Sequence, residues 1–108
     1  MNPIPVLGLF KNEDELRDHL AANLGLIERG LTLIDINYPV KTQQGANGAL
    51  DILAKDPYGC FVIIEVKRSD QAARQALHEL SKYISAFLST QHVDEQKLRC
   101  FVVSTHWH

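Results

Sequence analysis

The sequence contains little of several residue types on which specialised proteins depend. It has only two cysteines, Cys60 and Cys100, with no CxxC spacing, so neither a disulfide framework nor a cysteine zinc site is indicated. No stretch approaches the ~20 apolar residues that span a bilayer, and the start of the chain lacks the basic and apolar regions of a signal peptide. We therefore expect a cytoplasmic protein with reduced, partly buried thiols and no membrane partner.

An excess of positive charge is also absent. The chain has 11 basic and 13 acidic residues, a formal charge of -2, which counts mildly against extensive DNA contact. A divalent cation bound at an acidic site would reverse the sign locally, however. The hydrophobic content of 45% and charged content of 22% are ordinary for a globular protein, and 108 residues provide for a single domain.

Hydrophobic periodicity predicts six elements in the order α-β-β-β-α-β. Asn12 followed by Glu15 resembles a capping box at the start of the first helix, and the sequence from Asp56 to Gly59 is a strong turn signal. We expect the first strand to stop near Pro39. The expected helices are residues 13–24 and 70–88, and the expected strands are residues 31–40, 49–55, 60–67 and 98–104, with a loop at 41–48.

The third strand is expected at the centre of the sheet. Residues 61–64 form a continuous apolar run, which is typical of a strand covered on both faces. A helix joins this strand to the fourth, and such a connection favours a parallel crossover in a mixed sheet. The sequence therefore predicts an α/β fold with about four strands and helices on both faces.

Charged residues stand inside two of these strands. Glu65 and Lys67 follow the apolar run two residues apart, so they project from one face of the sheet. Asp51 lies between two apolar residues of the preceding strand. An odd-numbered connection or a bulge around residues 56–60 would place Asp51 across from Glu65, with Cβ atoms roughly 5 Å apart, whereas an even-numbered one would separate them.

Two such carboxylates would repel each other and would need a cation or a shared proton. Their hard oxygens suit Mg²⁺ or Mn²⁺, and the carbonyl of Val66 is a third candidate ligand. The metal would lower the pKa of a water and neutralise charge on a phosphate. Lys67 would orient that water or stabilise the transition state.

These residues resemble the PD-(D/E)XK nuclease superfamily, whose members have the restriction-endonuclease-like fold. The resemblance rests on Asp51 followed by Glu65-Val66-Lys67, and the flanking sequence from residue 12 to 105 is most similar to NucS-like and RecB-like nuclease domains. It implies a three-layer α/β/α core and metal-dependent hydrolysis of phosphodiester bonds in DNA, with RNA as an alternative substrate.

The resemblance also implies roles for residues outside this core. Glu15 would assist metal binding from the first helix, although its place in a capping box is a sufficient structural explanation. RecB-like members carry a glutamine and a tyrosine four residues apart on the next helix. Tyr83 fits the tyrosine, but Glu79 stands at the glutamine position, and Gln75 is a candidate substitute one turn earlier.

The remaining expectations concern partners and domain organisation. Arg68, Arg74 and Lys82 are weak candidates for contacts with nucleic acid, since scattered basic residues are usually solvated. A catalytically inactive module that binds nucleic acid or dimerises is the alternative function. Residues 1–108 are expected to be one nuclease-like domain, either complete or excised from a longer protein, with a homodimer or a fused specificity domain as alternatives for its assembly.

Overall fold

The computed structural model describes residues 12–42, 45, 47–67 and 70–104. The predicted order of elements is confirmed, with two short 3₁₀ turns added. The elements are α1 (Glu13–Ala22), η2 (Leu24–Leu26), β1 (Thr32–Lys41), β2 (Asn47–Lys55), β3 (Phe61–Lys67), α2 (Asp70–Gln91), η3 (Glu95–Lys97) and β4 (Leu98–Ser104). Among the described residues, no helix has the length and hydropathy needed to cross a membrane.

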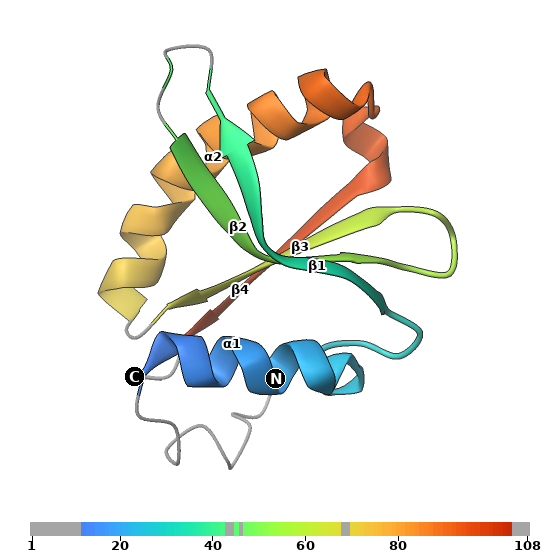
Figure 1. Ribbon diagram of the computed structural model, residues 1–108, viewed down its shortest axis with the longest axis vertical. Coiled ribbons are helices and arrows are strands. Elements are labelled where there is room, and N and C mark those ends of the chain that lie inside the picture. Colours follow the sequence, from blue (N-terminus) through green and yellow to red (C-terminus); the bar gives the residue numbers. More distant parts are fainter. Residues whose placement is uncertain (1–11, 43–44, 46, 68–69, 105–108) are drawn as a thin grey trace.

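The four strands form one mixed sheet in the order β1-β2-β3-β4 (Figure 1). The pairs β1–β2 and β2–β3 are antiparallel, and β3–β4 is parallel. Because α2 connects the two parallel strands, the predicted crossover is confirmed.

The two helices cover opposite faces of the sheet. Leu16 and Leu20 of α1 pack in one hydrophobic cluster with Ile52 and Ile64. A second cluster contains Leu80 and Phe87 of α2 together with Leu53 and Ile63, the strand neighbours that point the other way. All residues from Val62 to Val66 are buried, so β3 is the central, doubly covered strand that its apolar run predicted.

β1 differs most from its prediction. It continues through Pro39 to Lys41 rather than ending near the proline, because β1 is an edge strand and an edge tolerates a residue without an N–H donor. A register shift between Leu33 and Asp35 and a left-handed Asn37, with φ of 50°, distort the strand. The predicted loop at 41–48 is correspondingly shorter.

The connection between β2 and β3 is held by Asp56. One oxygen of this carboxylate accepts the N–H groups of Tyr58 and Cys60 at 2.9 and 2.8 Å, and the other lies 3.2 Å from Arg99, which also forms a pair of 2.6 Å bonds with Glu28. Burial opposes ionisation of Asp56, but these bonds hold its pKa below the usual value. The turn that sets the β2–β3 register is therefore fixed from β4 as well.

Both cysteines are unbridged. Partial burial is confirmed for Cys60 but is wrong for Cys100, which is exposed. The difference follows from topology, since Cys100 lies on β4, the other edge strand of the sheet.

Candidate functional site

β2 and β3 part at Asp51. The backbone ladder runs from Lys55 and Phe61 to Ile52 and Ile64, and the next step along it joins Asp51 to Glu65. Residues 56–60 connect the paired strands, and five is an odd number, so this is the register that the pairing of the two carboxylates required.

Side chains replace the backbone ladder at this step. The N–H of Asp51 donates to Glu65 Oε1 at 3.1 Å, and the N–H of Val66 donates to Asp51 Oδ2 at 2.8 Å. Each carboxylate thus binds the backbone of the opposite strand. The two acidic side chains are held side by side at the fork between the strands.

Glu65 is the more strongly perturbed of the pair. Glu65 is buried, with only 6% of its surface exposed. Burial raises the pKa of Glu65 from 4.5 to about 7, the charge of Asp51 adds to the shift, and the Asp51 N–H and the ammonium group of Lys67 oppose it. The pair therefore favours an additional positive charge, whether a proton or a cation.

A cavity of about 200 Å³ opens beside the pair. It lies between the fork and α2, and its lining brings Asp51, Glu65 and Lys67 together with two of the candidate auxiliary residues, Glu79 and Tyr83. The lining residues are Ala49, Asp51, Glu65, Lys67, Glu79, Leu80 and Tyr83. The Tyr83 ring also packs closely on Gly48 of β2, where a Cβ atom would collide with it.

The other residues singled out from the sequence lie elsewhere. Glu15 is exposed on α1, where its N–H donates to Asn12 Oδ1 at 2.9 Å, and it is not among the residues that line the cavity. Arg74 and Gln75 are exposed on α2 and likewise do not line it. Arg68 lies outside the described residues.

Three-carboxylate or histidine-containing metal clusters are absent from the described ranges. Within residues 12–42, 45, 47–67 and 70–104, no group of three or more His, Cys, Asp or Glu side chains could hold a metal ion. Among the described residues, Asp51 and Glu65 are the two acids that meet at the fork.

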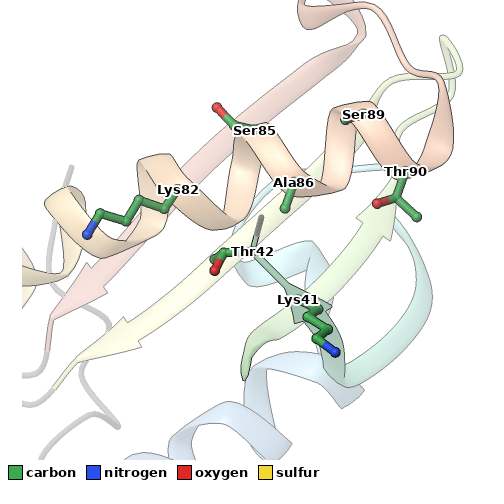
Figure 2. A pocket seen from close by; sticks show the side chains of 7 residues that line it. All are labelled: Lys41, Thr42, Lys82, Ser85, Ala86, Ser89 and Thr90. Carbon is green, nitrogen blue, oxygen red and sulfur yellow. The ribbon is translucent and has the colours of Figure 1, made fainter. Parts of the chain in front are cut away.

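A second hollow, of about 560 Å³, lies between α2 and the end of β1 (Figure 2). Of the residues that line this hollow, the sequence had marked only Lys82 as a candidate for contact with nucleic acid. The lining residues are Lys41, Thr42, Lys82, Ser85, Ala86, Ser89 and Thr90. The five lining residues from α2 recur at three- and four-residue steps, so the sequence already indicated that they share one face of the helix. Lys41 and Thr42 lay in a predicted loop, and nothing in the sequence indicated that they would lie next to α2.

Known proteins resemble this chain in sequence. Residues 12–107 match the family described as the Endonuclease NucS C-terminal domain. Endonuclease NucS of Methanocaldococcus jannaschii is 34% identical over 98 residues, which make up 91% of this chain and 34% of that protein. Endonuclease NucS of Corynebacterium efficiens is 34% identical over 79 residues, or 71% of this chain and 31% of that protein.

Two solved structures share the fold. A repair endonuclease from Pyrococcus abyssi matches with a TM-score of 0.63 and 20% identity, over 88% of this chain and 38% of that one. An EndoMS–dsDNA complex matches with a TM-score of 0.64 and 22% identity, over 86% of this chain and 36% of that one. This chain spans about a third of the length of the curated relatives.

The family match begins at the N-cap of α1 and continues past the end of β4, so it includes both faces of the sheet and the fork. The chain belongs to the Endonuclease NucS C-terminal domain family.

Proposed function

We propose that this domain is a Mg²⁺- or Mn²⁺-dependent endonuclease that hydrolyses phosphodiester bonds in DNA, with Asp51, Glu65 and Lys67 as its catalytic residues. The observation that carries the proposal is the carboxylate pair at the fork, where Asp51 and Glu65 bind each other's strands and burial raises the pKa of Glu65 to about 7. We further propose that the two helices and the mixed sheet form the three-layer restriction-endonuclease-like arrangement.

The donor set at the fork fits a hard divalent cation. Asp51 and Glu65 supply carboxylate oxygens, which Mg²⁺ and Mn²⁺ prefer, and a cation would relieve the repulsion that raises the pKa of Glu65. The Val66 N–H points toward Asp51. Because the N–H and C=O of a residue in an extended strand point to the same side, the Val66 carbonyl is directed to the fork as a third oxygen.

The chain's own residues would position the substrate around this group. A bound Mg²⁺ or Mn²⁺ supplies a water of lowered pKa and neutralises charge on the phosphate. Lys67 lines the same cavity and, as a compact cation, would hold a phosphate oxygen and stabilise its developing charge. The Tyr83 hydroxyl, opposite the fork on α2, would orient the DNA strand by a hydrogen bond.

DNA is the proposed partner because the family relatives are named endonucleases and one solved neighbour is a complex with dsDNA. The chain spans about a third of those relatives. We therefore propose that contacts from a second copy or a fused domain set the specificity for a particular DNA structure.

A second candidate function is DNA binding without cleavage. One observation favours it: Glu79 adds a further acidic side chain to the lining of the cavity, at the position where RecB-like nucleases carry glutamine. The site thus departs at this position from the pattern of those nucleases, whereas the fold that could bind DNA is retained. This function predicts salt-sensitive binding with no metal-dependent product.

The test is a cleavage assay on labelled single-stranded, duplex and forked DNA with Mn²⁺, Mg²⁺ or EDTA. The variants are Asp51→Asn and Glu65→Gln, and Glu95→Gln, an exposed carboxylate on η3, is the matched control. We expect metal-dependent cleavage that falls by on the order of a hundredfold or more in the two site variants, since changes to outer-sphere partners alone cost ~10–100-fold. Wild-type rates in Glu65→Gln would refute the assignment, and binding without any cleavage would support the second function.

A further inference from the structure

The hollow between α2 and the end of β1 is suited to an anionic ligand. Its lining carries two ammonium groups and four hydroxyl groups, from Lys41, Lys82, Thr42, Ser85, Ser89 and Thr90. None of the described residues that line it carries a carboxylate, although the whole chain has more acidic than basic residues. Figure 2 shows Lys82 extending from α2 and Lys41 from the end of β1, with Thr42 between them in this view.

The hollow adjoins the catalytic cavity along α2. Glu79, Leu80 and Tyr83 line the cavity, and residues from Lys82 onward line the hollow. Lys82 and Tyr83 are consecutive residues, so the two linings meet along this helix. A strand of nucleic acid that extends from the cavity along α2 would reach the hollow.

The distance along the helix from the cavity to the hollow corresponds to a few nucleotides of DNA. Lys82 and Ser85 follow Glu79 by three and six residues, or ~4.5 and ~9 Å along the helix axis at ~1.5 Å per residue. A DNA strand advances ~3.4 Å per nucleotide. The hollow would therefore meet phosphates within roughly one to three nucleotides of the bond in the cavity.

We propose that this hollow binds the backbone phosphates of the DNA strand that passes through the catalytic cavity, an inference that rests on the proposed nuclease function. Lysines and hydroxyl groups are the usual donors to phosphate oxygens, and such contacts fix the register of a nucleic acid without reading its sequence. Of the lining residues that the structure describes, none has an aromatic or amide side chain that could stack on a base or read its edge. Its chemistry thus favours the backbone over the bases.

The helix dipole of α2 favours a phosphate in the part of the hollow away from the C-terminal end of the helix. Thr90 is next to Gln91, the last residue of α2, and the carbonyl groups of a helix C-terminus disfavour anions within the last turn. Lys82 and Ser85 lie more than one turn earlier. Among the α2 residues, the phosphate contacts are therefore assigned to Lys82 and Ser85, and Lys41 adds a second positive charge from the end of β1.

The experiment measures binding of the 108-residue chain to a labelled DNA duplex in EDTA, which prevents cleavage, over a range of salt concentrations. The variants are Lys41→Ala and Lys82→Ala, both at exposed positions. The charge-matched control is Lys55→Ala, at the opposite end of β2. Lys41 pairs with Asn47 at the start of β2, and Lys55 lies ~26 Å from Asn47 along the strand at ~3.3 Å per residue. Circular dichroism verifies that each variant is folded.

Each hollow variant should reduce the slope of log K against log salt by ~0.9 and weaken binding about eightfold at 0.1 M salt, for any duplex sequence. Lys55→Ala should leave both unchanged. Equal binding by all three variants, or no binding of DNA by the wild type, would overturn the inference.

Cleavage in Mn²⁺ distinguishes this inference from the nuclease proposal. If the wild type cleaves and Asp51→Asn does not, but the hollow variants bind like Lys55→Ala, the nuclease stands and the phosphate site fails. If no protein cleaves, but Lys41→Ala and Lys82→Ala selectively lower the salt slope, the phosphate site stands and the nuclease fails.

Discussion

The carboxylate pair should make the metal-free protein less stable as the pH rises. The pKa of Glu65 is 4.5 in its ordinary state and about 7 in the folded protein. A group whose pKa is raised by folding contributes stability that is fully present below its unfolded pKa and is lost as the pH rises through its folded pKa. The loss therefore extends from about pH 4.5 to about pH 7, in a window where most other carboxylates are already ionised.

The magnitude follows from the shift. A difference of about 2.5 between the two pKa values, at ~1.36 kcal/mol for each pKa unit, corresponds to a loss of about 3 kcal/mol above pH 7. Glu65→Gln removes this loss, because the amide keeps the oxygen that accepts the Asp51 N–H and carries no charge. The stability advantage of the variant over the wild type should therefore be large at pH 8 and much smaller at pH 5.

Urea denaturation in EDTA, followed by circular dichroism, measures this difference. Wild type and Glu65→Gln are compared at about pH 5 and about pH 8, and their difference cancels the titration of all other groups. Adding Mn²⁺ at pH 8 should recover stability in the wild type alone, since a ligand that binds only the native state stabilises it. A difference in unfolding free energy that is the same at both pH values would refute the reasoning from burial and repulsion.

Two further substitutions test the packing around the site. Gly48→Ala should lower the free energy of unfolding, measured by urea denaturation, by ~1–3 kcal/mol because the added Cβ atom would overlap the Tyr83 ring. In a Tyr83→Ala background the same substitution should cost much less, and an equal cost would contradict the contact. Arg99→Met should lower the melting temperature, because Asp56 is nearly buried and Glu28 and Asp56 share this cation; a calorimetric transition like that of the wild type would show that the cluster does not fix the turn.

Local sequence patterns predicted most of the fold because its elements follow regular periods. The apolar run of β3 indicated burial on both faces, and the helix between β3 and β4 indicated the parallel crossover; both are observed. β1 was harder to place, since Pro39 is a stop signal in most strands and is tolerated here only because β1 is an edge. Edge position depends on the whole sheet and cannot be derived from the local sequence.

The cavity beside the fork was partly predictable for a similar reason. Asp51 and Glu65 interrupt apolar strands, which marked them from the sequence. The expected strands at 49–55 and 60–67 left the parity of their connection open, and the observed connection of residues 56–60 brings the two acids together. The hollow was not predictable, because Lys41 and Lys82 lie 41 positions apart in the sequence and line the same hollow only through the packing of α2 on the β1–β2 hairpin. No period or motif in the chain encodes that crossing.

The fork between β2 and β3 links the stability of the sheet to the proposed chemistry in one pair of residues. Where two strands part, their backbone N–H groups lose their ladder partners, and a buried donor without an acceptor costs ~1–3 kcal/mol. The Asp51 side chain accepts the N–H of Val66, and the Glu65 side chain accepts the N–H of Asp51. The two acids therefore replace the backbone acceptors that are missing where the strands part. Replacing either with alanine would remove an acceptor as well as a charge, and a loss of activity could then reflect a disordered fork. Asn and Gln retain the acceptor and remove only the charge, so the amide variants alone separate the chemistry of the pair from its part in the fold.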